Sequence, residues 1–381
     1  MERKIPVGIQ SFEKLRTEKF IYVDKSEYVY QLVHNNVPYF LSRPRRFGKS
    51  LLLSTLRAYW EGKRELFEGL KIEELEKSNS DAWKSYPVFY FDFNGDNFSS
   101  TDVHDVLDGL LKDWEGIYGD QYRDRTLGDR FQKLLELAMK KTGKRCVILV
   151  DEYDKPLLDT IDDTEAQTRI RDEIKGFFSS LKKADQFIHF IFITGVSKFH
   201  KVSIFSDLNQ LKDISLTKQY AGVCGITDEE LRRYFEPEVE RLAEEQKLNV
   251  SECLDELKKT YDGYHFHQDG VGVYNPYSMF NAFTDRDFGS YWFETGTPTF
   301  LIKKLRDNLF DVRKFTDHTI YASESVLKDY TGDGLDPIPL LYQTGYLTIE
   351  EYDKQKKRYT LSFPNEEVKY GFLESLMPFS L

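Results

Sequence analysis

A basic segment at residues 43–50 carries the residue types that bind phosphate groups. It reads Arg-Pro-Arg-Arg-Phe-Gly-Lys-Ser, and its first seven residues hold three arginines, one lysine and no acid. Phosphate binding requires backbone N–H groups that point inward, the N-terminus of a following helix and a lysine that reaches the outer phosphates. Gly48 lets the backbone approach a phosphate, Lys49 supplies the charge, and Ser50 offers a hydroxyl to Mg²⁺. The predicted cofactor-binding residues are Arg43, Pro44, Arg45, Arg46, Phe47, Gly48, Lys49, Ser50 and Leu51.

The first position of this loop departs from the usual pattern. The pattern G-x-x-x-x-G-K-[ST] has glycine where this chain has Arg43, so we expect the loop to turn differently at its start. Arg45 and Arg46 add charge where the backbone geometry is poorer. The alternative interpretation is a basic surface turn that caps a helix.

An acidic pair follows an apolar run elsewhere in the chain. Residues 147–150 are apolar and are followed by Asp151 and Glu152. In enzymes that transfer phosphoryl groups, an aspartate at such a strand end holds Mg²⁺, and a neighbouring carboxylate acts as the base that activates water. We expect this strand to neighbour the strand before the basic loop, so that the loop faces the acidic pair. A buried strand that leaves the core at an acidic turn is the alternative.

A third strand end supplies a polar residue that could act with these groups. Residues 187–193 are mostly apolar and lead into Thr194, and a polar residue there would lie between the basic loop and the acidic pair. Thr194 is the first choice for sensing the outer phosphate or positioning water, and Ser197 is the second. The predicted catalytic residues are Lys49, Glu152 and Thr194. The predicted metal ligands are Ser50 and Asp151.

These residues need a sheet to position them. Apolar runs predict strands at residues 37–41, 86–93, 146–150 and 187–193, with a fifth at 214–216. Helical spacing follows residue 49 and recurs at residues 102–118, 130–141 and 165–183. Strands that alternate with helices predict an α/β fold, with a parallel sheet covered by helices on both faces.

The character of the sequence changes near residue 220. Thr227 followed by Glu230 predicts a capping box that opens a helix at residues 228–235. A mainly helical stretch follows at 237–261, and short strands, turns and helices come after it. We predict four segments: an N-terminal segment at 1–35, the core at 36–220, a helical, winged-helix-like lid at 221–300 and an α+β region at 301–381.

Composition limits the class of protein. The 381 residues carry a net charge of −11, which argues against broad affinity for nucleic acid, because such binding rests on many Lys and Arg contacts to phosphates. There is no 18-residue apolar run and no apolar signal segment. Three cysteines are too few for a disulfide framework. We expect a cytoplasmic protein with no membrane partner.

Ordered motifs along the whole chain resemble a known family. They lie at residues 5–12, 22–26, 42–50, 151–156, 194–197, 261–264, 275–278, 291–292, 295–298, 342–347 and 364–368. In these segments the chain resembles the bacterial AAA-ATPase-like proteins, which are P-loop ATPases of AAA+ or STAND-like type with a helical, winged-helix-like extension. The resemblance implies that residues 43–50 are the family's own form of the phosphate loop and that the cofactors are ATP and Mg²⁺.

The same resemblance bears on nucleic acid as a partner. Many relatives look to carry a PD-(D/E)XK nuclease domain after the segment that matches residues 364–368. The sequence ends at Leu381, so we expect that domain to be missing, either naturally or because the chain is a fragment. Residues 172–175 lie within a predicted helix and do not replace it. DNA is therefore suggested as a partner only by the nuclease-bearing relatives.

The sequence supports three hypotheses about function. The first is an ATP hydrolase in which ATP binding and hydrolysis move the C-terminal region, from residue 220 onward. The second is a nucleotide-gated interaction or defence switch with little turnover, which acts on a protein partner or on further copies of itself. The third is a scaffold that binds no nucleotide.

Overall fold

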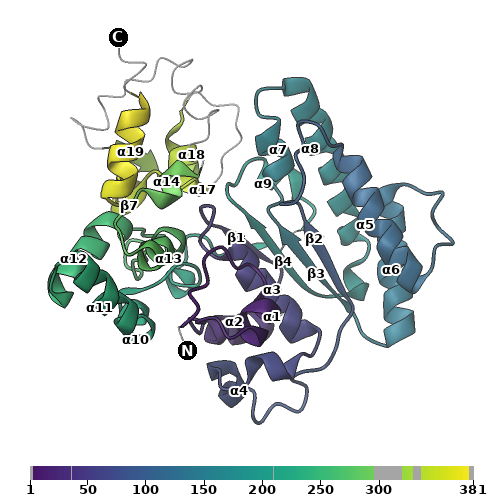
Figure 1. Cartoon of the computed structure of the whole chain (residues 1–381). Helices are drawn as coiled ribbons and strands as arrows, with labels where there is room; N and C mark the ends of the chain where they lie inside the picture. The colour runs from purple at the N-terminus through teal and green to yellow at the C-terminus, as the bar shows by residue number, and fades with distance from the viewer. Residues whose placement is uncertain (1–2, 36, 209, 296–319, 329–335, 377–381) are drawn as a thin grey trace. The chain divides into compact units, whose positions relative to one another are not determined.

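A computed structural model describes residues 3–35, 37–208, 210–295, 320–328 and 336–376 (Figure 1). The chain divides into two compact units. We call the first the sheet unit; it comprises Ser26–Ser42 and Leu52–Ile214. We call the second the loop unit; it comprises Met1–Lys25, Arg43–Leu51 and Ser215–Leu381 and so contains the predicted phosphate loop.

The sheet unit contains a five-stranded parallel sheet in the order β2-β3-β4-β1-β5. The strands are β1 (Tyr39–Ser42), β2 (Val88–Asp92), β3 (Cys146–Asp151), β4 (Ile188–Gly195) and β5 (Lys212–Asp213). Every residue of β3 is buried, as expected for a central strand that is covered on both faces. The predicted parallel α/β fold is confirmed.

Two details of the predicted sheet are wrong. The fifth strand lies at Lys212–Asp213 and not at 214–216: Ile214 still donates to Phe40, but the carbonyl of Ser215 accepts from Arg43 instead of continuing the ladder. In addition, β4 pairs with both β1 and β3, so β1 and β3 are not neighbours. The end of β4 consequently lies between the ends of the other two strands, as predicted for Thr194.

Helices cover both faces of this sheet. On one face of β2, Phe89 and Phe91 pack edge-on against Trp114 of α5 (Val103–Tyr118) and Phe131 of α6 (Leu127–Thr142). Side chains alternate along a strand, so Tyr90 points to the opposite face, where Arg57 of α3 lies over its ring. The helices of this unit are α2 (Ser26–Val33), α3 (Lys49–Trp60, whose first residues belong to the loop unit), α4 (Lys71–Leu75), α5 (Val103–Tyr118), α6 (Leu127–Thr142), α7 (Lys155–Asp159), α8 (Thr164–Ser179) and α9 (Lys201–Ile204).

Caps explain where these helices begin and end. Thr126 caps α6, which therefore begins at Leu127, three residues before the predicted start. Gly143 ends the same helix with a φ of 69°. The helix predicted at 165–183 is α8 and ends at Ser179, after which the chain continues as a short 3₁₀ turn. The 3₁₀ turns are Arg64–Phe67, Ser180–Lys182, Asp185–Phe187 and Lys218–Tyr220.

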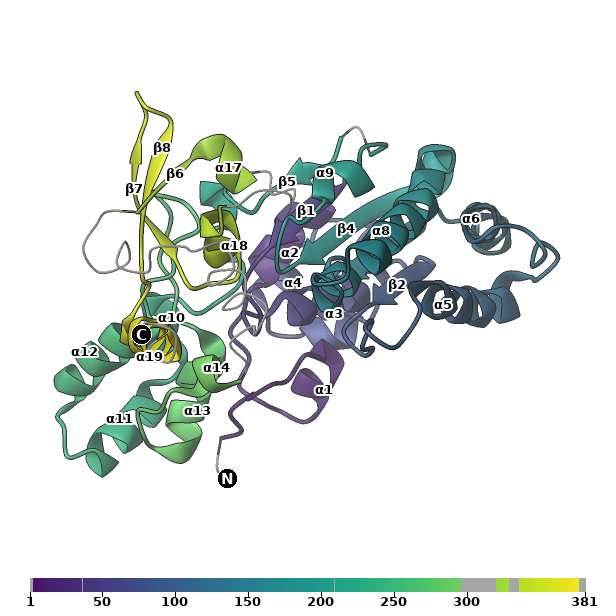
Figure 2. The ribbon, with the colours of Figure 1, turned by 90° about the horizontal axis from the view of Figure 1, so that it is seen from above.

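The loop unit is mainly helical and contains a second, antiparallel sheet. Its strands are β6 (Ile320–Ser323), β7 (Thr348–Asp353) and β8 (Arg358–Ser362), in the order β6-β8-β7 (Figure 2). Its helices are α1 (Phe12–Thr17), α10 (Asp228–Tyr234), α11 (Glu236–Glu245), α12 (Val250–Tyr261), α13 (Pro276–Asp285), α14 (Tyr291–Glu294), α17 (Glu324–Lys328), α18 (Ile338–Gln343) and α19 (Glu366–Leu376).

Both ends of the sequence contribute to the loop unit. The capping box predicted from Thr227 and Glu230 is present, with both reciprocal hydrogen bonds. Lys25 also donates to Glu230 and to the carbonyl of Gly222, which ties the N-terminal segment to α10. The four predicted segment boundaries stay predictions. Residues 296–300 of the predicted lid, which include 296–298 of one quoted motif, and residues 301–319, 329–335 and 377–381 of the predicted C-terminal region lie outside the described residues.

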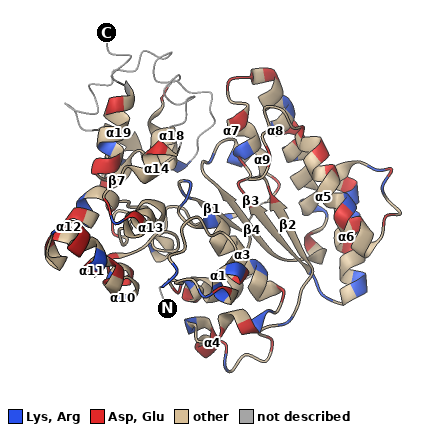
Figure 3. Ribbon diagram, in the orientation of Figure 1, with Lys and Arg blue, Asp and Glu red and all other residues tan. Residues whose placement is uncertain are grey.

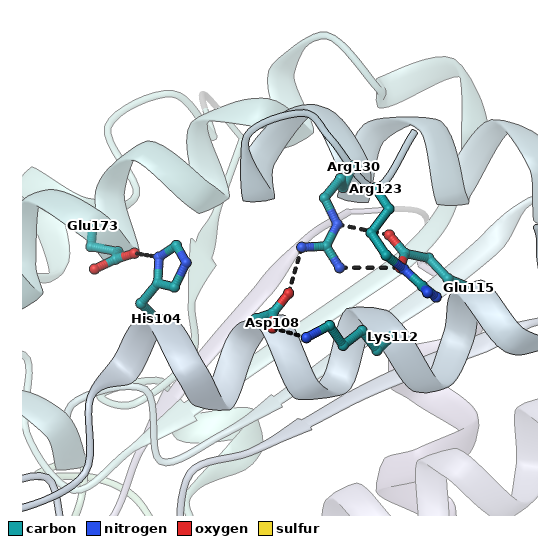
Figure 4. A network of polar contacts seen from close by, with 7 residues as sticks. All are labelled: His104, Asp108, Lys112, Glu115, Arg123, Arg130 and Glu173. Atoms are coloured by element: carbon teal, nitrogen blue, oxygen red, sulfur yellow. Dashed lines mark hydrogen bonds and ion pairs between the residues drawn. The ribbon is translucent and has the colours of Figure 1, made fainter. Parts of the chain in front are cut away.

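Charges of both signs are interspersed along α5 and α6, and part of this set forms a buried ion cluster (Figures 3 and 4). Arg130 of α6 donates to both carboxylate oxygens of Glu115 at 2.7 and 3.1 Å and to Asp108 at 2.6 Å. The side chains of Arg130 and Glu115 are only 5% and 3% exposed. Burial opposes the charged form of Glu115, but hydrogen bonds from Arg130 and Arg123 outweigh it, so the pKa of this carboxyl is lowered.

Replacing Arg130 with leucine should destabilise the sheet unit by about 3–5 kcal/mol, because it leaves Glu115 buried without its main partner. The free energy of unfolding in urea measures this loss. The difference in the free energy of unfolding between the variant and the wild type should be fully present above pH 4.5, the ordinary carboxyl pKa. It should shrink as the pH falls through the lowered pKa of Glu115. Lys112→Met, which removes only an exposed partner of Asp108, is the control and should change stability by about 0.5 kcal/mol or less. Equal losses in the two variants would contradict the prediction.

Candidate functional site

Two residues of the predicted phosphate loop have a left-handed backbone conformation. Arg46 has a φ of 66° and Gly48 a φ of 99°, whereas Phe47 between them does not have a positive φ. Alternating right- and left-handed residues bring successive N–H groups to one side of the chain and form a concavity that binds anions. The loop ends at Lys49, where α3 begins, and the first turn of a helix presents N–H groups that are not used within it.

Hydrogen bonds to two loop carbonyls fix the direction of the loop amides. The indole nitrogen of Trp292 donates to the carbonyl of Arg45 at 3.0 Å, and the backbone N–H of Gly225 donates to the carbonyl of Phe47 at 3.0 Å. The described chain has no cis peptide bond, and in a trans peptide the C=O and N–H groups point in opposite directions. The N–H groups of Arg46 and Gly48 therefore point away from Trp292 and Gly225.

Lys49 is buried at the end of the loop, where α3 begins. Its side chain is only 3% exposed, and its ammonium group donates to the carbonyl of Pro44 at 3.1 Å. The N-terminus of α3 carries a partial positive charge beside this ammonium group, and both favour a nearby negative charge. Ser50 and Leu51 follow in the first turn and are partly exposed.

Arg43 has a different place from the one that the sequence suggests. Its guanidinium group is 1% exposed, donates to the carbonyls of Ser215 at 2.7 Å and Tyr220 at 3.0 Å, and lies 3.9 Å from the ring centre of Phe266. This side chain therefore anchors the start of the loop to the protein. It stands where the usual pattern has glycine, and its contacts are the physical reason that a large residue fits there.

The remaining loop side chains lie against aromatic rings of the loop unit. Phe47 is buried against Tyr264 and Phe266, with ring centres 4.7 and 6.0 Å apart. The guanidinium of Arg46, an exposed residue, lies 4.1 Å from the ring centre of Tyr277. The guanidinium of Arg45, which is partly exposed, lies 5.6 Å from the Trp292 ring. Stacking of this kind orients a guanidinium group while leaving its edge able to meet a phosphate.

In the sheet unit, Asp151 is buried at the carboxyl end of β3 and held by hydroxyl groups. Its exposure is 1%, Thr194 donates to Oδ1 at 2.8 Å, and Tyr90 donates to Oδ2 at 3.3 Å. Burial raises the pKa of Tyr90, and the charges of Asp151 and Asp92 raise it further, so Tyr90 stays a neutral donor. Two of the residues predicted separately for the site, Asp151 and Thr194, are thus in direct contact.

Glu152 has an unusual backbone conformation. Its φ is 52°, a left-handed conformation that costs a residue other than glycine about 1–3 kcal/mol and often marks a functional position. Thr194 holds this turn: its Oγ1 accepts from the N–H of Glu152 at 3.3 Å, and its carbonyl accepts from Tyr153 at 3.0 Å. The side-chain nitrogen of Asn94 can donate to either acid: to Asp151 at 3.3 Å in one orientation of the amide, or to Glu152 at 2.5 Å with the amide turned over.

Ser197, the second choice for a sensing residue, has a structural role. Its hydroxyl and its N–H both donate to the buried Asp154 at 2.7 Å, and Val196 donates to the same carboxylate at 3.1 Å. Gly195 permits this arrangement, because a Cβ atom there would lie 2.7 Å from the Tyr153 ring and 2.8 Å from Asp154. The turn after β4 is therefore held close to Tyr153 and Asp154.

Several residues of the site were not predicted from the sequence: Tyr90, Asn94, Asp154, Gly195, Gly225 and Trp292. Tyr90 lies in β2 and Asn94 lies just after it. The signal that could have predicted them is that polar residues at the end of a strand next to β3 can reach the acidic pair. The partners of the loop lie about 180 and 250 residues further along the chain. Residues 291–292 form one of the family motifs, but no local pattern indicates that Trp292 or Gly225 contacts the loop. Lys49 and Ser50 belong to the loop unit, whereas Asp151, Glu152 and Thr194 belong to the sheet unit.

Together, a parallel sheet and a glycine-lysine-serine loop at the start of a helix define a nucleotide-binding α/β protein of the P-loop class. The model of the family described as predicted AAA-ATPase matches residues 6–205 of this chain. The chain belongs to this AAA-ATPase-like family, as its motifs indicated.

One curated relative is similar over nearly the whole chain. The "Uncharacterized protein in vnfD 5'region" of Azotobacter chroococcum mcd 1 is 38% identical over 384 residues, which cover 98% of this chain and 70% of that protein. Among solved structures, the Aeropyrum pernix ORC2 protein (ADPNP-ADP complexes) is 10% identical, covering 96% of this chain and 94% of that chain. The Aeropyrum pernix ORC1 protein in complex with DNA is 11% identical, covering 94% of this chain and 93% of that chain. Both have a TM-score of 0.32, which is too low for the likeness to bear on the fold.

Replacing Gly195 with alanine should destabilise the sheet unit by about 1–3 kcal/mol, because the added Cβ overlaps Tyr153 and Asp154. Thermal unfolding measures the loss. Gly176→Ala in α8 is the matched control: its Cβ would meet nothing within 4 Å, and alanine favours a helix interior by about 0.5–1 kcal/mol. A Gly195→Ala protein as stable as the control would show that the close approach at this turn is not needed.

Proposed function

We propose that this protein is a cytoplasmic ATP hydrolase that couples the binding and hydrolysis of ATP·Mg²⁺ to movement of its C-terminal region. The observation that carries this proposal is the geometry of the phosphate loop. The sign of φ alternates over residues 46–48, and the N–H groups of Arg46 and Gly48 point away from Trp292 and Gly225, which bind the preceding carbonyls. The buried ammonium group of Lys49 lies at the start of α3. This is the donor set that binds a polyphosphate. Its anchoring by Arg43 supports the view that residues 43–50 form such a loop despite the missing glycine.

The residues fit Mg²⁺ as the metal cofactor. Mg²⁺ prefers oxygen ligands and is usually held by one or two protein groups together with substrate phosphates and water. The hydroxyl of Ser50 and the carboxylate of Asp151 would be those groups, and Thr194 and Tyr90 orient the carboxylate. When bound, Mg²⁺ neutralises charge that develops on the phosphates.

The other side chains take separate roles in this proposal. Lys49, Arg45 and Arg46 balance the charge of the phosphates, and Arg43 contributes through its backbone while its side chain anchors the loop. Glu152 orients the attacking water and accepts its proton. Thr194 contacts Asp151 and the backbone of Glu152, so it acts by positioning both acids.

The proposed coupling to the C-terminal region rests on the composition of the loop unit. Residues 43–51 and 215–381 form one compact unit, and Trp292, Gly225 and Tyr264 contact the loop directly. A change of the loop on binding or losing the terminal phosphate would therefore act first on these neighbours. We include a protein partner or another copy of this chain as the receiver of that change, and DNA only by analogy with nuclease-bearing relatives.

The buried, free cysteines Cys146, Cys224 and Cys253 support a reducing location. No helix among the described residues is long and apolar enough to cross a membrane.

Lys49→Ala should lower ATP turnover by about 100-fold or more, because positioning and charge supply most of the catalysis in phosphoryl transfer. Glu152→Gln should bind ATP with near wild-type affinity but lose about 100-fold or more of the turnover, since a general base contributes that much. Phosphate release measures turnover, and calorimetry measures binding. Lys71→Ala, an exposed lysine paired with Glu74, is the control and should change neither. Unchanged turnover in both site variants would refute the assigned roles.

A second function is a nucleotide-gated switch that binds ATP tightly and turns over little. The specific observation in its favour is Arg43, which replaces the first loop glycine and fixes the loop to Ser215 and Tyr220. One burst of phosphate per chain followed by a negligible steady rate would identify this switch. A scaffold that binds no nucleotide is separated from both by a thermal shift with ATP·Mg²⁺, since a ligand at 100 times its Kd adds about 2.7 kcal/mol of stability.

A further inference from the structure

Trp292 is a buried residue of α14 that contacts Arg45 of the phosphate loop in two ways. Its indole nitrogen donates to the carbonyl of Arg45 at 3.0 Å, and its ring lies 5.6 Å from the guanidinium of the same residue. Gly345 lies close to both Pro44 and Trp292: an added Cβ there would lie 2.9 Å from Pro44 and 3.3 Å from the Trp292 ring. The segment around residues 292 and 345 is therefore packed closely against the first half of the loop.

Trp292 is itself held by a buried carboxylate on α19. Its backbone N–H lies 2.7 Å from Glu367 Oε1 and 3.1 Å from Ser278 Oγ, and the Ser278 hydroxyl donates to Glu367 Oε2 at 2.8 Å. Ser278 is fully buried and Glu367 is 6% exposed. Burial raises the pKa of Glu367 to about 7, although the hydrogen bonds from Ser278, Trp292 and Phe293 oppose this rise. A buried carboxylate is costly, so these donors must stay in place for α13, α14 and α19 to keep their present packing.

The bond from Trp292 selects one orientation of the peptide between Arg45 and Arg46. With the Arg45 carbonyl directed to the indole, the Arg46 N–H points the opposite way, as the trans peptide requires. Turning this N–H toward Trp292 would break the indole bond. Any anion that binds the Arg46 N–H from the far side therefore favours the same peptide orientation as Trp292 does. Two interactions that favour one state must strengthen each other.

We propose that Trp292 is a positioning residue of the phosphate loop and that Ser278 and Glu367 transmit the occupancy of this loop to the C-terminal helix α19. The inference rests on the proposed function, because it takes ATP·Mg²⁺ as the ligand of the loop. Binding of the nucleotide fixes the 45–46 peptide, which strengthens the Trp292 bond and stabilises the contacts of Trp292 with Glu367. By the same linkage, anything that displaces α19 weakens nucleotide binding.

The first test is the affinity of Trp292→Phe for AMPPNP·Mg²⁺, measured by calorimetry. Phenylalanine retains an aromatic ring and the backbone N–H but loses the indole donor. The Kd should rise about threefold to tenfold, which corresponds to the loss of one neutral hydrogen bond. The matched control is Trp114→Phe, in which a tryptophan packed against Phe89 and Phe91 of the sheet unit is changed in the same way. Its Kd should equal that of the wild type.

Tryptophan fluorescence supplies a signature that a merely structural residue would lack. The chain has four tryptophans, of which Trp60, Trp83 and Trp114 belong to the sheet unit and Trp292 contacts the loop. AMPPNP·Mg²⁺ should change the emission of the wild type and of Trp114→Phe, and this change should be absent in Trp292→Phe.

Glu367→Gln tests the transmission step without touching the indole. It replaces one acceptor oxygen by an amide, so the Ser278 hydroxyl can no longer donate to that position and its hydrogen bond there must reverse direction or break. We expect weaker AMPPNP·Mg²⁺ binding. In the double variant with Trp292→Phe, the loss of binding free energy should be smaller than the sum of the losses in the two single variants, because both residues act on one network. If Glu367 serves packing alone, the variant would unfold at a lower temperature and bind the nucleotide as the wild type does.

The outcomes separate this inference from the proposed function. Failure of the wild type to bind AMPPNP·Mg²⁺ overturns the proposed function and the inference together. Wild-type binding with unchanged affinity in both Trp292→Phe and Glu367→Gln overturns the inference alone. If Trp292→Phe does not fold, Glu367→Gln decides: a raised Kd in this folded variant supports the inference, and an unchanged Kd refutes it.

Discussion

The conformation of the phosphate loop depends on the hydrogen bonds that its carbonyl groups accept. A loop that binds an anion must direct several N–H groups to one side, and the planar trans peptide then sends the preceding carbonyls to the other side. Those carbonyls need donors, since a buried polar group without a partner is costly. Trp292 and Gly225 supply two of these donors, and Lys49 supplies a third from its side chain.

This requirement explains why a short loop near the N-terminus belongs to a unit made largely of residues from 215 onward. At Arg43 the direction of donation is reversed, because here the loop supplies the donor and the later segment supplies the acceptors. The Arg43 guanidinium donates to the carbonyls of Ser215 and Tyr220, so the loop satisfies acceptors of the later segment while the later segment satisfies acceptors of the loop. The exchange makes the loop and the described segments around residues 215–225 and 292 interdependent, and it gives the missing glycine at position 43 a structural explanation.

In the sheet unit, Thr194 has a comparable organising role. β4 lies between β1 and β3, so the end of β4 meets the end of β3, and one threonine contacts the side chain of Asp151 and the backbone of Glu152. The left-handed conformation of Glu152 needs such support, because local sequence preference does not favour it. Asp154 and Gly195 in turn hold the chain after β4 close to this turn.

The sequence alone determined the local elements of this protein. Apolar runs of strand length predicted four of the five parallel strands, and Thr227 with Glu230 predicted a capping box that the structure contains, because both signals depend on residues that are close in the chain. The phosphate loop and the acidic pair were predicted in the same way, from adjacent residues. The family followed from motifs, and the match to residues 6–205 confirms it.

Only the tertiary structure decided which groups meet. It placed β4 between β1 and β3, shifted the fifth strand to Lys212–Asp213, and gave the side chain of Arg43 carbonyl partners more than 170 residues away. It also brought Trp292 and Gly225 to the loop and Asn94 to the acidic pair. These contacts join residues far apart in the chain, and no periodicity or short motif encodes such partners. They are set by how whole elements pack, which is why the donors that shape the loop could not be found from the loop's own sequence.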